Sequence, residues 1–275
     1  MSEKTMPRLG VAVEHSYFET LGDWIFEDNR TIEIQDFAMS VLDRDDTASI
    51  IKKYKTLLDG YDGEIGIHGP FIGFDISSGD PEIRKVVKKR LLQGLETAQA
   101  LNATQMVVHS PFNQWLTQNR WNFEWLRRQV FESALDTLEP VVKRAEEIGC
   151  TLVLENINDI VPSDRRMLAD AVGSPNLKLS VDTGHAHLVH GSNGGPPVDY
   201  FIKDAGEMLA HLHLQDCDGY ADRHWLPGEG SILWTSVFDA IAAMENQPRL
   251  IIEVIRNIHR IPDAVRALKA RGLAC

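Results

Sequence analysis

Short apolar runs alternate along the chain with longer stretches in which apolar residues recur at helical spacing. Eight runs rich in Val, Ile and Leu follow this pattern: Leu9–Val13, Thr31–Phe37, Glu64–His68, Gln105–His109, Thr151–Glu155, Lys178–Asp182, Ala210–Leu214 and Leu250–Val254. Runs of this length followed by amphipathic stretches are typical of parallel strands connected by crossover helices. The pattern therefore predicts eight consecutive strand–helix units.

Several helix boundaries can be located in the stretches between the runs. The triplet Asp80-Pro81-Glu82 combines an N-cap residue, a proline at the first helical position and an acid in the first turn, and an apolar face continues to Ala100. A second long helix is expected from about Asn122 to Ile148, where Gly149 ends it. Pro262 is expected to open the last helix.

The segment Gly191–Pro197 is rich in Gly, Ser, Asn and Pro and predicts a loop. It is either a plain surface connection or, because it follows the run that ends in Asp182, a mobile flap over a site.

The length and the absence of any composition break favour one domain over residues 1–275. A single (β/α)₈ TIM barrel has about 250 residues, which fits the 275 residues of this chain. A doubly wound open sheet is the alternative, but it normally carries a glycine-rich turn after its first strand. The sequence Val13-Glu14-His15-Ser16 is not such a turn. We therefore predict the closed barrel.

Composition narrows the classes of partner. The chain has 28 Lys and Arg against 40 Asp and Glu, a net charge of −12, which disfavours binding to nucleic acid. Cys150, Cys217 and Cys275 are far apart and form neither a disulfide framework nor a zinc-binding pair, so a reducing cytoplasm is expected. The polar start Met1–Pro7 lacks a secretory apolar stretch, and nothing in the sequence is long and apolar enough to span a membrane.

Six consecutive runs place a side chain that can bind metal at or next to their carboxyl end. These residues are His68, His109, Glu155, Asp182, His213 and Glu253. The carboxyl ends of the strands of a (β/α)₈ barrel form one rim, which is where its reactive residues lie. Carboxylates gathered there would raise one another's pKa unless a cation neutralised them. The sequence therefore predicts a divalent metal site for Mn²⁺, Mg²⁺, Co²⁺ or Zn²⁺.

Two further pairs of residues are related by period-two spacing. His211 and His213 point to the same side of their strand; His213 is nearer the rim and is the expected ligand, whereas His211 lies one layer deeper as a packed or supporting residue. Asp222 and His224, two apart in an extended segment, are expected to point together into the mouth of the barrel.

Taken in order, these motifs resemble those of a known superfamily. They are Ile67-His68-Gly-Pro, Val-Val-His109, Leu-Glu155-Asn, Asp182-Thr-Gly-His185, His211-Leu-His213-Leu-Gln-Asp216 and Asp222-x-His224 followed by Pro-Gly-Glu-Gly. The chain is identified by them as a member of the xylose-isomerase-like TIM-barrel superfamily. That superfamily contains sugar phosphate isomerases and epimerases and the endonuclease IV type of abasic-site nuclease.

The resemblance implies a ligand set but leaves the branch open. In the keto-sugar epimerases, one metal ion is held by residues matching Glu155, Asp182, His213 and Glu253, and residues matching His68 and His185 face the substrate. In the nucleases, three zinc ions use the same four residues together with those matching His68, His109, His185, Asp222 and His224. All nine residues are present in this chain, so one ion is favoured and up to three fit.

Three observations favour sugar chemistry. The net charge is unfavourable for a duplex binder, the Pro-Gly-Glu-Gly turn is common among the isomerase-like members, and the loops Phe71–Asp75 and Phe112–Trp115 resemble the walls of a small-molecule pocket. Trp115 and Trp225 are candidates for stacking on a sugar. The 3-epimerases usually have an arginine six residues after the seventh-strand histidine; this chain has Gly219 there, and Arg223 or Arg256 are candidates to replace it.

The favoured hypothesis is a metal-dependent isomerase or epimerase that acts on a keto sugar or sugar acid through an enediolate. Glu155 and Glu253 are its expected catalytic bases, on different sides of the mouth. The alternatives are a metal-dependent lyase or decarboxylase acting on a β-keto sugar acid, a trinuclear zinc abasic-site endonuclease, and a barrel that only binds its ligand. The resemblance also implies a homo-oligomer, often a dimer or tetramer.

Overall fold

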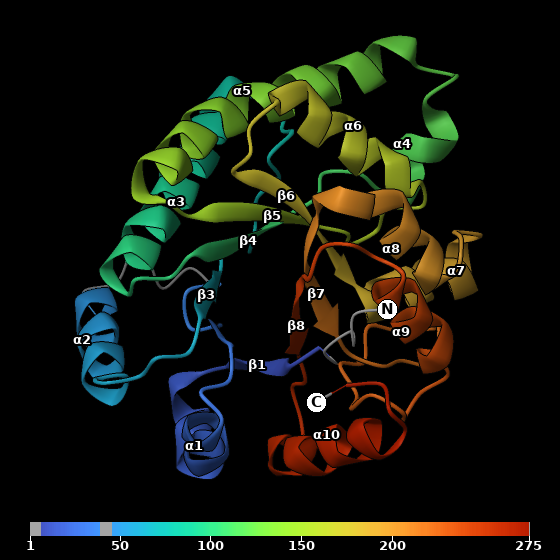
Figure 1. Cartoon of the computed structure of the whole chain (residues 1–275). Helices are drawn as coiled ribbons and strands as arrows, with labels where there is room; N and C mark the ends of the chain where they lie inside the picture. Colours follow the sequence, from blue (N-terminus) through green and yellow to red (C-terminus); the bar gives the residue numbers. More distant parts are fainter. Residues whose placement is uncertain (1–6, 39–45, 275) are drawn as a thin grey trace.

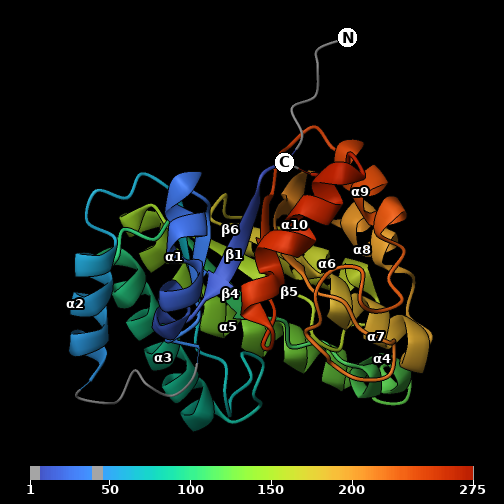
Figure 2. The same cartoon turned by 90° about the horizontal axis from the view of Figure 1, so that it is seen from below.

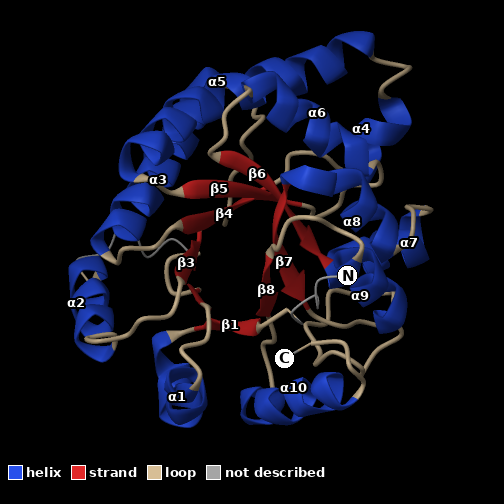
Figure 3. Ribbon diagram, in the orientation of Figure 1, coloured by secondary structure: helices blue, strands red, loops and turns tan. Residues whose placement is uncertain are grey.

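The strands form a closed parallel barrel in the computed structural model, which describes residues 7–38 and 46–274. Neighbouring strands pair in sequence order, and β8 closes the barrel on β1 (Figure 1 and Figure 3). The strands are β1 Leu9–Val13, β2 Ile32–Ile34, β3 Ile65–His68, β4 Gln105–His109, β5 Thr151–Glu155, β6 Leu177–Asp182, β7 Leu209–Leu214 and β8 Arg249–Ile252. The prediction of a (β/α)₈ TIM barrel is confirmed.

Helices surround this barrel on the outside (Figure 1). They are α1 Phe18–Glu27, α2 Thr47–Leu57, α3 Pro81–Ala100, α4 Gln114–Asn119, α5 Glu124–Ile148, α6 Pro162–Val172, α7 Thr183–Asn193, α8 Val198–Ala205, α9 Trp234–Ala242 and α10 Ile261–Ala270. The side view in Figure 2 shows α4 and α7 at one end of the barrel. Because they follow the carboxyl ends of β4 and β6, that end is the one expected to carry the reactive residues.

The predicted helix boundaries are largely confirmed. The side chain of Asp80 caps α3 by accepting a hydrogen bond from the backbone N–H of Glu82, and Pro262 is the second residue of α10. Gly149 ends α5 in a left-handed conformation with φ 68°, which glycine adopts without steric cost.

Three elements differ most from the prediction, and the ends of four further strands shift by one or two residues. The second strand covers only Ile32–Ile34, because the chain turns before Phe37. The long helix starts at Glu124 rather than Asn122 and is preceded by the separate short helix α4. The predicted loop Gly191–Pro197 is wrong for its first three residues, which form the last turn of α7; Gly194, with φ 72°, ends that helix.

Two sequence expectations rest on residues outside the described ranges. These are the polar start Met1–Met6 and Cys275. Among the helices that the structure does describe, none is both long enough and apolar enough to cross a membrane.

Candidate metal centre at the mouth of the barrel

Among the four principal predicted ligands, three carboxylates converge on an imidazole nitrogen of the fourth, His213. Glu155 ends β5, Asp182 ends β6, His213 is the last residue but one of β7, and Glu253 directly follows β8. The Nδ1 atom of His213 lies 2.5 Å from Glu155 Oε1, 4.0 Å from Asp182 Oδ2 and 3.7 Å from Glu253 Oε2. Asp182, His213 and Glu253 form one of the groups whose ligand atoms lie within 4.8 Å of one another. Four neighbouring strands thus present one cluster of donors.

Two oxygens of this cluster lack the partners that buried carboxylates need. Glu155 Oε2 and Asp182 Oδ2 are buried and have no hydrogen-bond partner among the described residues. A buried polar atom without a partner is costly, and a carboxylate more so, unless a cation is present. These free oxygens, together with the imidazole, are the donors that a divalent ion takes from a protein. The residues therefore fit the metal predicted from the sequence.

The pKa values of two acids in the cluster move in opposite directions, because the His213 imidazole holds the pKa of Glu155 well below its usual range despite burial. Burial raises the pKa of Asp182, and the charges of Glu155 and Glu253 raise it further. Burial alone would lower the pKa of His213, yet Glu253 and Glu155 beside it raise that pKa well above its usual value. The same carboxylates would attract a divalent cation into the cluster.

His68 and His109 form a second donor group with the other oxygen of Glu155. Their Nε2 atoms lie 3.7 Å and 3.5 Å from Glu155 Oε2 and 3.4 Å from each other. Burial lowers the pKa of His109 to about 3, so this ring is neutral and has a free lone pair. The three side chains satisfy the distance requirement of a metal site.

The predicted convergence of Asp222 and His224 occurs, and His185 joins them. His185 Nε2 lies 3.3 Å and His224 Nε2 3.2 Å from Asp222. These three side chains form another group with metal-binding spacing. The Gln215 amide links the group to the main cluster, because it donates to Asp222 Oδ1 at 2.9 Å and to Asp182 Oδ1 at 3.2 Å.

The segment that carries Asp222 and His224, between β7 and α9, is organised by the single carboxylate of Asp216. This carboxylate accepts hydrogen bonds from the backbone N–H groups of Gly228 and Ile232, at 2.8 Å and 3.2 Å, and from Trp234 Nε1 at 2.8 Å. Asp216 also pairs through its backbone with Trp225. Both ends of the segment are therefore fastened at one point.

Glu33, in the middle of β2, belongs to the site and was missed by the sequence analysis. Its carboxylate contacts His213 Nε2 at 2.8 Å and His211 Nε2 at 3.0 Å. The prediction that His211 is a deeper supporting residue agrees with this contact. The signal in the sequence is the acid in Ile32-Glu33-Ile34, since period two turns Glu33 to the opposite side from its apolar neighbours.

A cavity of about 200 Å³ opens beside the second donor group. Its lining includes His109, Phe71, Phe112 and Asn158, and it extends to Asp75. Phe71 stacks on His109 with ring centroids 4.0 Å apart. The two loops predicted to form pocket walls, Phe71–Asp75 and Phe112–Trp115, both contribute to this lining. Both polar and apolar side chains line this cavity, as they do in sites for small polar molecules.

The remaining predicted substrate contacts lie toward the surface. Trp115 is 56% exposed on α4 and stacks on Phe123, and Trp225 is 36% exposed. Arg256 is exposed after β8. Arg223 forms a two-point ion pair with Asp218, at 3.1 Å and 2.9 Å. Arg223 is therefore already paired and is a poor replacement for the family's arginine.

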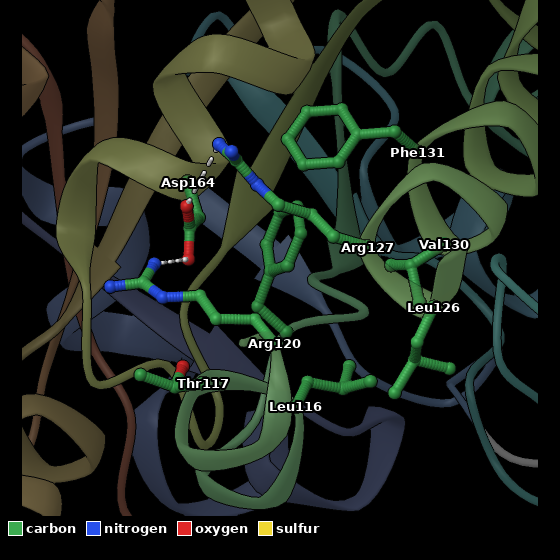
Figure 4. Close-up of a pocket in the computed structure, with 9 residues that line it drawn as sticks. Leu116, Thr117, Arg120, Leu126, Arg127, Val130, Phe131 and Asp164 are labelled. Carbon is green, nitrogen blue, oxygen red and sulfur yellow. Dashed lines mark ion pairs between the residues drawn. The ribbon is translucent and has the colours of Figure 1, made fainter. Parts of the chain in front are cut away.

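A separate small pocket lies between α4, α5 and α6 (Figure 4). Arg120 and Arg127 both point toward the carboxylate of Asp164, with N–O distances of 3.8 Å and 4.0 Å. Phe112 lines both this pocket and the cavity beside His109. Because its charges face each other and its described lining contains no predicted metal ligand, this pocket is not the candidate centre.

Comparison with known proteins assigns the family. A family model described as the xylose isomerase-like TIM barrel matches residues 29–271. The chain belongs to this family, as the sequence motifs predicted.

Two relatives illustrate the range of similarity. An uncharacterized protein of Methanocaldococcus jannaschii is 27% identical over 213 residues, which cover 72% of this chain and 69% of that protein. The D-psicose 3-epimerase of Ruminiclostridium cellulolyticum is 25% identical over 192 residues, which cover 68% of this chain but only 61% of that enzyme, less than two thirds of its length.

Two solved structures match almost the whole barrel. A D-tagatose 3-epimerase-like protein superposes with a TM-score of 0.74 at 25% identity, covering 96% of both chains. A protein from Thermus thermophilus, whose crystals were soaked with ZnCl₂, has a TM-score of 0.72 at 26% identity and covers 96% of this chain and 98% of that chain.

Proposed function

We propose that the protein is a divalent-metal-dependent isomerase or epimerase of a keto sugar or a related sugar acid. The observation that carries this proposal is the convergence of Glu155, Asp182 and Glu253 on Nδ1 of His213, with two buried carboxylate oxygens that have no hydrogen-bond partner among the described residues. The similarity to proteins named D-psicose 3-epimerase and D-tagatose 3-epimerase-like supports the choice of substrate class.

Glu155, Asp182, His213 and Glu253 would hold one ion of Mn²⁺, Mg²⁺, Co²⁺ or Zn²⁺. When bound, such an ion supplies Lewis-acid polarisation of a carbonyl group and its neighbouring hydroxyl. The homo-oligomer and the cytoplasmic location stay predictions from the sequence.

The protein's own side chains account for the proton transfers. Glu155 and Glu253 extend from β5 and β8. Acting on opposite faces of a planar enediolate, one carboxylate removes the proton next to the carbonyl and the other returns a proton from the opposite side, which inverts the carbon. His68 and His185 would orient substrate oxygens, and the ring of Phe71, which stacks on His109, would shield one side of the site from water.

Isotope exchange tests this proposal directly. The metal-loaded protein is incubated in D₂O with a panel of ketoses and keto sugar acids, and deuterium at the carbon next to the carbonyl is followed by NMR. We expect incorporation by the wild type and a loss of at least about 100-fold in Glu155→Gln and Glu253→Gln, since each removes a base. Glu96→Gln, an exposed glutamate on α3, serves as the control with the same chemical change. An absence of exchange across the panel would refute the proposal.

A second candidate is a trinuclear zinc phosphodiesterase of the abasic-site type. The specific observation in its favour is that the nine residues assemble into groups with metal-binding spacing, including His68–His109–Glu155 and His185–Asp222–His224. Metal analysis of the purified protein separates the two candidates, because one and three ions per chain point to different chemistry. Nicking of an abasic duplex that is lost on chelation would favour the nuclease, although the net charge of −12 opposes it.

The lyase or decarboxylase alternative shares the enediolate chemistry. It is distinguished by product analysis with a β-keto sugar acid, since release of CO₂ or a shorter carbon skeleton is not produced by epimerisation.

A further inference from the structure

Glu33 is a buried acid on a strand that bears none of the predicted metal ligands. Its side chain lies inside the barrel, where only 2% of the residue is exposed. In the strand register Glu33 is paired with Ala12 on β1 and Gly66 on β3. These two small neighbours leave room for a long side chain directed at the opposite wall. An ionised group in such a place requires partners, and the identity of those partners indicates its role.

Both oxygens of Glu33 are engaged by histidines of β7. Oε1 lies 2.8 Å from Nε2 of His213, and Oε2 lies 3.0 Å from Nε2 of His211. His211 is in turn fixed from behind, because its Nδ1 lies 2.8 Å from Oγ of Ser180 on β6. The carboxylate is therefore held in one orientation by groups on two other strands.

The contact between Glu33 and Nε2 of His213 bears on which nitrogen of that imidazole faces the metal-ligand cluster. Both ring nitrogens face carboxylates, Nδ1 that of Glu155 and Nε2 that of Glu33. A cation held on the Glu155 side would take the lone pair of Nδ1, and the remaining ring proton would then lie on Nε2, where Glu33 accepts it. In this structure Nδ1 is the atom that faces Glu155, Asp182 and Glu253. We infer that Glu33 is a positioning residue that fixes the tautomer and the ring orientation of His213, so that Nδ1 is presented to a divalent metal ion.

Gln35 extends the same support to a second ligand. Its side-chain amide donates to Glu33 Oε1 at 3.0 Å and to Glu253 Oε1 at 2.9 Å. One amide group thus ties the residue behind His213 to the carboxylate at the end of β8. Two ligands from different strands are therefore aligned through β2.

This inference rests on the metal site proposed above and not on the reaction carried out there. Residues that hydrogen-bond to metal ligands typically contribute about 10- to 100-fold to metal affinity. Glu33→Gln keeps the shape of the side chain but replaces the charged acceptor by a weaker neutral one. We expect this variant to bind Zn²⁺ about 10- to 100-fold more weakly than the wild type, measured by competition with a chromophoric chelator. Glu96→Gln should bind Zn²⁺ like the wild type.

The melting temperature of the metal-free proteins separates positioning from a purely structural role. A structural role alone would change that temperature and leave the Zn²⁺ dissociation constant as in the wild type, which would overturn the inference. If the wild type bound no Zn²⁺, the metal site itself would fail together with the inference. Binding by the wild type that Glu33→Gln leaves unaltered would remove only the role of Glu33.

A second measurement needs no alteration of Glu33. Side-chain ¹⁵N NMR of histidine-labelled, Zn²⁺-loaded protein reports which ring nitrogen carries the proton, and loss of a signal in His213→Asn assigns the resonance. We expect a protonated Nε2 and a metal-bound Nδ1 for His213. The reverse arrangement would contradict the proposal whatever the affinity of the variant.

Discussion

Arg165, which is fully buried on α6, offers the sharpest test of how charge is balanced beneath the site. Its Nη1 atom donates to the backbone oxygen of Leu154, at 2.9 Å, and to that of Ser180. Its Nε atom lies 3.3 Å from Oδ1 of Asp159, which is also buried. Replacing Arg165 by methionine removes the cation and keeps most of the volume of the side chain. The carboxylate of Asp159 is then left without its ion-pair partner.

The loss in the free energy of unfolding expected for Arg165→Met follows from the burial of its ion pair with Asp159. Removing one member of a buried pair costs about 3–5 kcal/mol, because the other charge is left uncompensated. Burial raises the pKa of Asp159 to about 6, even though Arg165 lowers it. Since this folded-state pKa lies above the ordinary value of 3.8, the proton-linked stability is fully present below pH 3.8 and is lost as the pH rises through 6. Without Arg165 the pKa of Asp159 rises further.

Urea unfolding of the metal-free protein at about pH 5 and about pH 8, followed by circular dichroism, measures this cost. Arg165→Met should lose about 3–5 kcal/mol at the higher pH and clearly less at the lower one, where Asp159 takes up a proton. The double variant Arg165→Met/Asp159→Asn should recover part of the lost free energy of unfolding at the higher pH. Arg166→Met, at the exposed neighbouring residue, should stay within about 0.5 kcal/mol of the wild type. A loss below about 1 kcal/mol, or an equal loss at both pH values, would refute the reasoning.

Three further predictions concern the helix cap, the thiols and the cavity. Asp80→Ala should lower the free energy of unfolding by about 1 kcal/mol in urea titrations, because α3 loses its N-cap; an unchanged midpoint would show that the cap contributes nothing. Burial raises the pKa of Cys150 to about 12 and that of Cys217 to about 11, so in a Cys275→Ser background a thiol reagent at about pH 8 should label neither before denaturant is added. Rapid labelling of the native protein would contradict their burial. Phe71→Ala should raise KM more than it lowers kcat in a steady-state assay, since it removes a wall of the cavity, and a change confined to kcat would exclude that role.

The strands and the main donor cluster could be predicted because burial leaves a direct mark on the sequence. Strands covered on both faces appear as apolar runs, and a charged or imidazole side chain at their end stands out. Glu33 was not identified by looking for such side chains at strand ends, because it lies in the middle of β2. The partner that explains it, His213, is 180 residues away along the chain, and no local pattern connects the two.

The end of α7 was not predictable from composition. Gly191, Gly194 and Gly195 are all suited to end a helix, and only Gly194 does so. Gly191 serves a different purpose, because a Cβ atom there would collide with the backbone oxygen of Gly219. Its lack of a side chain allows α7 to approach the segment after β7, and that contact is visible only in three dimensions.

The fastening of the segment between β7 and α9 by Asp216 has a consequence for protein engineering. Because Asp216 holds both ends of this segment, we expect that the residues between Asp216 and Trp234 can be replaced as a unit while these two residues are kept. Gly230 has to be transplanted with it, since a Cβ atom there would collide with the carboxylate of Asp216. Such a replacement would change Asp222 and His224 and would leave the eight strands as they are.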